Sequence, residues 1–190
     1  MTSTTIFGNG NMGSAIAGIV GSGDNQVQVL DRDDSAEITG DVVVLAVPYG
    51  EVAGILEARR DQFAGKVVVD ITNPVNFETF DGLVVPADSS AAAEIAAALP
   101  EAKVVKAFNT TFGGTLVAKE VGPLPTTVLI AGDDADAKSL VVEVIEAGGL
   151  TVIDAGALKR ARELEALGFL QITLAAGEKV SWTGGFGVVR

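Results

Sequence analysis

The stretch TIFGNGNMGSAIA at residues 5–17 decides the fold class of this chain. Its glycines Gly8, Gly10 and Gly13 have the spacing G-x-G-x-x-G. The chain has 23 glycines in 190 residues, so this spacing alone is weak evidence. Its surroundings are more informative, because a strand-like segment, TTIF, precedes the glycines and a helix-like segment, SAIAGIV, follows them. A glycine turn between a strand and a helix predicts an α/β fold.

Each glycine has a physical role in such a turn. Gly8 would permit the tight bend, Gly10 would let a pyrophosphate approach the backbone, and Gly13 would let the helix pack closely on the strand. Free N–H groups at the start of the helix would then face the phosphates. The motif therefore predicts a dinucleotide site, and a turn with a purely structural role is the alternative.

The rest of the chain alternates between strand-like and helix-like segments. Apolar runs such as VVVLAV (42–47) and KVVVD (66–70) are typical of strands buried on both faces of a parallel sheet. The alternation predicts a Rossmann-like, doubly wound and mostly parallel sheet. We expect strands at residues 4–8, 26–31, 41–47, 66–71, 103–108, 126–131 and 150–154. We expect helices at residues 11–21, 51–63, 89–99, 134–147 and 158–177.

Two features of this layout affect the site. The ten residues DRDDSAEITG (31–40) are too few for a crossover with a full helix, so we expect a turn or a clipped helix there. Residues 1–155 are expected to form a dinucleotide-binding domain. Residues 156–190 are expected to complete the same domain as a short C-terminal helix and tail.

Composition excludes several classes of function. The net charge of −12 would repel phosphate backbones and anionic membranes, so we expect neither nucleic acid nor a membrane as partner. No apolar run approaches the roughly 20 residues that span a bilayer. The N-terminus has no signal-like segment, which makes the cytoplasm the default location.

The chain has no cysteine and no histidine. It therefore lacks thiolate ligands, a cysteine nucleophile and the most common general base. Hydride transfer between two stacked rings fits this composition, because it requires positioning and a dry site more than proton shuttling. We therefore expect neither a metal nor a catalytic acid or base.

The residues after the second strand bear on the choice of dinucleotide. Asp31 lies about 20 residues after the glycines, where a carboxylate binds the adenosine ribose hydroxyls of NAD. Arg32 follows it, and a guanidinium there can bind the 2′-phosphate of NADP. NAD and NADP both remain open, and the two side chains could instead pair or cap the loop.

Two more strands end in residues suited to a ligand. Ala46, Val47 and Pro48 end the third strand and would form a stiff wall beside the nicotinamide ribose. Asn73 and Pro74 follow the fourth strand, where Asn73 and nearby backbone amides could bind the nicotinamide carboxamide. Ordinary strand-ending turns are the alternative, because Asn-Pro is a strong turn signal.

The chain resembles the NADPH-dependent F420 reductases. The segments GNGNMGSAIA, LAVPY, DITNPV, VVKAFNT, IAGDD and DAGALKRARELE occur in the order and spacing of that family, from Ile6 to about Leu174. VVKAFNT followed by AGDD and DAG-x-L-x-x-x-R is the most specific part. The resemblance implies a Rossmann domain with a small C-terminal addition that passes hydride between NADP and the deazaflavin coenzyme F420. The cytoplasmic reductase domains of transmembrane ferric reductases resemble the same family.

The resemblance also implies roles for the dinucleotide side of the site. The pyrophosphate turn would consist of Gly8, Asn9, Gly10, Asn11 and Met12. Arg32 would meet the 2′-phosphate. The family commonly has serine or threonine before this arginine, whereas this chain has Asp31, so NAD stays an alternative to NADP.

On the acceptor side, the resemblance places Ala107, Phe108 and Asn109 beneath the stacked deazaflavin. Phe108 would offer a flat apolar surface and Asn109 a donor–acceptor pair, with core packing as the alternative for Phe108. Trp182 and Phe186 could close over the second ring, or belong to a frayed tail or a dimer contact.

The leading hypothesis is an NAD(P)H-dependent oxidoreductase with F420 as acceptor. A small imine or ferric reductase is one alternative, and a dinucleotide-binding sensor without turnover is another. The small-residue segment AAAEIAAAL (91–99) could cover the sheet or meet a second subunit, so a homodimer also stays open.

Overall fold

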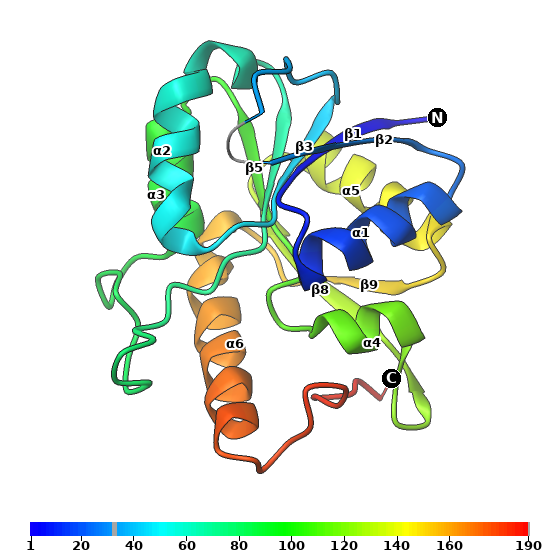
Figure 1. The fold of residues 1–190 in the computed structure, drawn as a ribbon, viewed down its shortest axis with the longest axis vertical. Helices are drawn as coiled ribbons and strands as arrows, with labels where there is room; N and C mark the ends of the chain where they lie inside the picture. The colour runs from blue at the N-terminus through cyan, green and yellow to red at the C-terminus, as the bar shows by residue number, and fades with distance from the viewer. Residues whose placement is uncertain (32–33, 190) are drawn as a thin grey trace.

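The computed structural model describes residues 1–31 and 34–189. Within these residues, seven strands form one sheet in the order β2-β1-β3-β4-β5-β8-β9 (Figure 1). The strands are β1 (Ser3–Phe7), β2 (Gln26–Leu30), β3 (Val42–Leu45), β4 (Val67–Asp70), β5 (Lys103–Lys106), β8 (Thr127–Gly132) and β9 (Thr151–Asp154). A separate hairpin consists of β6 (Glu120–Val121) and β7 (Leu124–Pro125).

Helices cover both faces of the sheet. They are α1 (Asn11–Ser22), α2 (Tyr49–Arg59), α3 (Ala91–Ala98), α4 (Gly113–Ala118), α5 (Ala135–Ala147) and α6 (Ala161–Ala176), with 3-10 turns η1 (Arg60–Phe63) and η2 (Leu158–Arg160). In Figure 1, α2 and α3 lie on one side of the sheet and α1 and α5 on the other. This arrangement confirms the predicted doubly wound α/β fold with a C-terminal helix.

The central strands β3 and β4 are buried on both faces because their apolar side chains alternate between two cores. In β3, Val42 and Val44 pack in the core beneath α1 and α5. Val43 and Leu45 pack in the other core, with side chains from α2 and α3. This alternation follows from the two-residue repeat of a strand, and it explains why β3 is an unbroken apolar run.

The direction of β8 was not predicted from the sequence. β1 to β5 pair in parallel, whereas β8 pairs with β5 in the antiparallel sense. The chain between them forms α4 and the β6–β7 hairpin instead of a helix that returns along the sheet. It therefore enters β8 from the edge at which β5 ended.

The connection from β2 to β3 is short, as predicted. Its described part, residue 31 and residues 34–41, contains no helix, and β3 pairs with β1 on the side opposite β2. Among the described residues, no helix has both the length and the apolar character needed to cross a bilayer.

Candidate functional site

The candidate site is the edge of the sheet at which the five parallel strands end. Backbone hydrogen bonds continue past the strand ends and tie the loops together: Gly8 N donates to Leu30 O at 2.9 Å, and Ala46 N donates to Phe7 O at 2.9 Å. The strand order places the ends of β2, β1, β3, β4 and β5 side by side along this rim. In open α/β sheets, ligands bind at the carboxyl ends of the strands, where the connections from two adjacent strands run in opposite directions.

The glycine turn after β1 has two glycines that the chain itself requires. Gly8 has φ of +102°, and a Cβ there would lie 2.3 Å from the carbonyl oxygen of Ala46. A Cβ at Gly13 would lie 2.0 Å from the carbonyl oxygen of Gly8. Close approach of α1, β1 and the β3 loop therefore accounts for both glycines.

Gly10 is different, because no contact within the chain requires it. It is exposed at the start of α1, and a Cβ there would have no neighbour within 4 Å. Gly10 is the residue before α1 and has no side chain that could cap the helix. The first turn of α1 also carries no acidic residue. In contrast, Ser90 and Asp134 cap α3 and α5 through their side chains. The start of α1 thus has the space and the positive helix dipole that suit a phosphate group.

Asp31 lies next to this turn. Asn9 Nδ2 donates to Asp31 Oδ2 at 2.7 Å, and Asp31 N donates to Asp34 Oδ2 at 2.6 Å. The exposed carboxylate of Asp31 is thereby held beside the glycine turn, on the side toward β2. Arg32, the residue expected at a 2′-phosphate, lies outside the described residues.

The loop after β3 forms the next part of the rim. Ala46 and Val47 are half-buried, and Pro48 is exposed at the start of α2. Ala46 also touches the glycine turn through the close approach of its carbonyl to Gly8. The structure thus brings the residues predicted for the pyrophosphate and for the nicotinamide ribose into one continuous surface.

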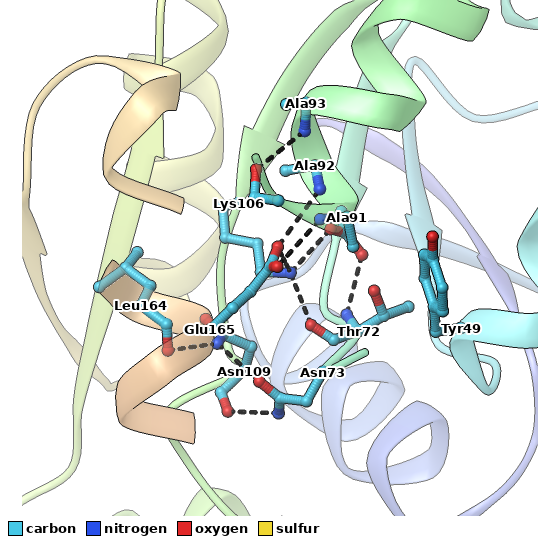
Figure 2. A network of polar contacts seen from close by, with 12 residues as sticks. Tyr49, Thr72, Asn73, Ala91, Ala92, Ala93, Lys106, Asn109, Leu164 and Glu165 are labelled. Atoms are coloured by element: carbon cyan, nitrogen blue, oxygen red, sulfur yellow. Dashed lines mark hydrogen bonds and ion pairs between the residues drawn. The ribbon is translucent and has the colours of Figure 1, made fainter. Parts of the chain in front are cut away.

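Asn73 and Asn109 bind each other across the loops after β4 and β5 (Figure 2). Asn109 Nδ2 donates to Asn73 Oδ1 at 2.9 Å and to Leu164 O at 2.8 Å. In return, Asn73 Nδ2 donates to Asn109 O at 2.8 Å. The Asn73 side chain thus donates one hydrogen bond and accepts one within the protein, and its neighbour Pro74 is buried.

The residues expected beneath the acceptor are buried. Phe108 is 3% exposed and packs in the core under α1 and α5. Its φ of +62° turns the chain at this point so that the ring enters the core. Ala107 and Asn109 are also buried, so these three residues underlie the rim and do not form its surface.

The C-terminal tail crosses from α6 to α4. The ring of Trp182 packs on Phe112, just before α4, with the ring centroids 5.0 Å apart. The backbone N–H of Phe186 donates to Gln171 Oε1 of α6 at 3.4 Å. The rings of Trp182 and Phe186 are partly exposed. The tail is therefore packed against two elements and is not a frayed end.

A buried network of charges below the rim was not predicted. Lys106 Nζ donates to Asp70 Oδ2 at 2.8 Å, to Glu165 Oε1 at 2.8 Å and to Thr72 O at 2.5 Å. The side chains of Asp70, Lys106 and Glu165 are 0% exposed. A signal was available in the sequence: the strands VVVD and VVK each end an apolar run on a charged residue.

Burial changes the ionisation of groups around this network. Burial raises the pKa of the Glu165 carboxyl above its ordinary value, and the nearby Lys106 opposes that rise without cancelling it. Burial, and a hydrogen bond from its hydroxyl to the Glu94 carboxylate, raise the pKa of Tyr49. The Tyr49 hydroxyl is therefore a hydrogen-bond donor at neutral pH.

The parallel sheet, the open glycine turn and the aligned strand ends define a dinucleotide-binding protein of the Rossmann class. Comparisons with known proteins narrow this class. Residues 23–74 match the family model described as NADP oxidoreductase, coenzyme F420-dependent. The chain is 32% identical over 159 residues to the F420-dependent NADP reductase of Methanocaldococcus jannaschii, covering 82% of this chain and 70% of that protein. The chain belongs to the family of F420-dependent NADP reductases.

The chain is similar to two further proteins. A crystal structure of a putative F420-dependent NADP reductase from Arthrobacter sp. FB24 superposes with a TM-score of 0.84 at 25% identity, over 100% of both chains. The chain is also 37% identical over 136 residues to the metalloreductase STEAP3 of Rattus norvegicus, covering 70% of this chain and 26% of that protein. The match to this metalloreductase thus covers about a quarter of a longer protein.

Proposed function

We propose that this protein is an oxidoreductase that transfers hydride between NADP(H) and coenzyme F420. The observation that carries the proposal is Gly10, whose missing side chain leaves open space at the uncapped start of α1. Membership in the F420-dependent NADP reductase family supports the identity of both substrates.

The order of the strand ends supports one orientation of the dinucleotide along the rim. The adenosine would lie near Asp31, the pyrophosphate over residues 8–12, and the nicotinamide ribose against residues 46–48. The nicotinamide would then lie near Asn73 and Pro74, above Ala107 and Asn109. This order follows that of β2, β1, β3, β4 and β5 in the sheet.

The chemistry requires little of the protein beyond positioning. The reduced nicotinamide supplies the hydride and the deazaflavin accepts it. The chain has no histidine or cysteine, and its role is to bind both rings, orient them and exclude water. Asn73, Asn109 and α6 hold the loops on which the nicotinamide would rest.

NADP is the proposed dinucleotide, and the carboxylate of Asp31 supports use of NAD as a second substrate. A carboxylate at the end of β2 favours ribose hydroxyls and repels a 2′-phosphate. We therefore propose that the enzyme prefers NADPH and retains measurable activity with NADH.

A steady-state assay tests the proposed function. Oxidation of NADPH and of NADH is measured with F420, FMN and a ferric chelate as acceptors. We expect the highest kcat/KM for NADPH with F420. Turnover only with the ferric chelate would support a metalloreductase instead. Binding of the dinucleotide without its oxidation in the presence of any acceptor would support a sensor.

The location and the oligomeric state belong to the same proposal. We propose the cytoplasm, where reduced dinucleotides are supplied to such enzymes. We also propose a homodimer, supported by exposed apolar side chains such as Phe77 (60% exposed) and Val84 (54%), and by an apolar groove of about 520 Å³ lined by α2 and α3. Sedimentation equilibrium tests the dimer, and a monomer mass at micromolar concentration would contradict it.

A further inference from the structure

We propose that Glu165 is a positioning residue for hydride transfer. Through Lys106 and the start of α3, it fixes the loops after β4 and β5 that underlie the nicotinamide. This inference rests on the proposed function, because that function places the nicotinamide above these loops.

The first step of the argument is the central position of Lys106. Its ammonium group on β5 joins two distant parts of the chain: the end of β4 with the following loop, through Asp70 and the carbonyl of Thr72, and α6, through Glu165. Figure 2 shows Thr72 and Glu165 close to the side-chain nitrogen of Lys106. The loop after β4 thus cannot move relative to β5 or α6 without breaking a charge-assisted hydrogen bond.

Glu165 extends this network to α3. Its carboxylate accepts hydrogen bonds from Ala91 N at 2.9 Å and from Ala92 N at 3.3 Å. These two N–H groups belong to the first turn of α3, where a negative charge is favourable. One carboxylate therefore connects α6, α3 and, through Lys106, the ends of β4 and β5.

One face of α6 carries the contacts to the rim. The carbonyl of Leu164 accepts from Asn109 Nδ2, and Glu165 reaches Lys106. Gly168 lies one turn further on, and a Cβ there would be 2.3 Å from Asn73 Oδ1. The sequence of α6 therefore permits close contact with the Asn73–Asn109 pair, and Glu165 sets the position of that contact.

Stability alone does not explain a buried network of two carboxylates and one ammonium group. Apolar side chains of similar volume often hold a core as well as a buried ion pair does. Charge-assisted hydrogen bonds add a fixed direction, which matters where a loop supports a reacting ring. The location directly below Asn73 and Asn109 thus points to a role in geometry.

The test compares Glu165→Gln with the control Glu163→Gln. Both variants remove one carboxylate from α6, but Glu163 is half-exposed and pairs only with Arg160 in the part of the chain that the structure describes. Nicotinamide fluorescence of bound NADPH reports the environment of the ring without requiring an acceptor. Turnover with F420 and with 4-deuterated NADPH reports the hydride step.

We expect Glu165→Gln to alter the fluorescence of bound NADPH and to lower kcat at least about tenfold, because small displacements of reacting groups have large effects on rate. The dissociation constant should change by less than about threefold, since the pyrophosphate turn is untouched. The deuterium isotope effect on kcat should rise. Glu163→Gln should match the wild type in every measurement.

If Glu165→Gln does not fold, Gly168→Ala can be used instead, because it displaces the same loops without a change in charge. The added methyl group would press on Asn73 and should produce the same altered fluorescence. Wild-type fluorescence, kcat and isotope effect in Glu165→Gln, or in Gly168→Ala if Glu165→Gln does not fold, with only a lower unfolding temperature, would overturn the proposal.

The same measurements distinguish failure of the positioning role from failure of the proposed function. If wild-type protein binds NADPH but does not reduce F420, and Glu165→Gln still alters the fluorescence, the positioning role stands and the acceptor is wrong. If wild-type protein does not bind NADPH at all, both proposals are wrong.

Discussion

The motif glycines Gly8, Gly10 and Gly13 are required for different reasons. Gly8 and Gly13 are required by contacts of 2.3 Å and 2.0 Å that a Cβ would make with backbone oxygens. Gly10 faces open space at the start of α1. The G-x-G-x-x-G spacing does not distinguish a glycine required by backbone packing from one that leaves space for a ligand. The sequence could therefore predict the turn but could not tell which glycine faces the ligand.

Gly10→Val should abolish dinucleotide binding without unfolding the protein. The side chain meets nothing in the chain, so the unfolding temperature should stay near that of the wild type. The dissociation constant for NADPH should rise at least tenfold, which corresponds to about 1.4 kcal/mol. Gly18→Val is the matched control, because Gly18 is also exposed on α1 with no neighbour within 4 Å. Unchanged affinity in Gly10→Val would mean that phosphate binds elsewhere.

Asp31→Ser should increase the preference for NADPH over NADH. The substitution removes a carboxylate that repels a 2′-phosphate and binds ribose hydroxyls. We expect the ratio of kcat/KM values to shift toward NADPH by about tenfold, or about 1.4 kcal/mol. Asp61→Ser removes the same charge from an exposed site on η1 and should leave the ratio unchanged. A shift toward NADH would contradict this role for Asp31.

At the scale of elements, the parts of the fold with a regular apolar period were predictable. The expected strands at residues 26–31, 41–47 and 66–71 correspond to β2, β3 and β4. The helix α4 and the β6–β7 hairpin were missed, because GGTLVAKEVGPLP has no apolar period long enough to identify either. The antiparallel direction of β8 depends on this missed segment, so it could not be predicted either.

The start of α3 illustrates how one element depends on distant parts of the chain. Ser90 Oγ accepts from Ala93 N at 3.0 Å, and the Glu165 carboxylate accepts from the two preceding N–H groups. The Ser90 cap is local and visible in the sequence. The contribution of Glu165 comes from 74 residues away and is not.

Ser90→Ala should lower the free energy of unfolding by about 1 kcal/mol, because it removes the side-chain cap of a short helix. Denaturant unfolding at neutral pH measures this value. Ser139→Ala is a suitable comparison, since the Ser139 hydroxyl is exposed on α5 and binds only Ala135 O among the contacts of the described residues. An effect of Ser90→Ala no larger than that of Ser139→Ala would show that the cap contributes little.

For the whole molecule, the loops that follow the parallel strands were predictable and the charged network beneath them was not. The segments DITNPV, VVKAFNT and DAGALKRARELE were identified as characteristic of the family. Asp70, Lys106 and Glu165 belong to these three segments and meet in one buried cluster. Lys106 and Glu165 are 59 residues apart, and no local pattern could predict their contact.

The buried state of Glu165 predicts a pH dependence of stability. Its pKa is raised above the ordinary value of 4.5, so the folded chain holds this proton more tightly than the unfolded chain does. The stabilisation from this group is therefore full below about pH 4.5 and is lost as the pH rises through the raised pKa. Glu165→Gln stays neutral throughout.

The unfolding free energy of the wild type minus that of Glu165→Gln should consequently be largest at acid pH and decrease toward neutral pH. Denaturant unfolding at a series of pH values measures it, and Glu163→Gln corrects for the loss of one carboxylate from α6. A difference that grows as the pH rises would contradict the assignment of Glu165 as a buried group with a raised pKa.

The most direct test of the account is a crystal structure of the protein with NADPH bound. The account predicts the pyrophosphate at the start of α1 over residues 8–12, with the nicotinamide ribose beside Ala46 and the nicotinamide above the Asn73–Asn109 pair. Electron density for the dinucleotide at another surface, with the glycine turn empty, would contradict it.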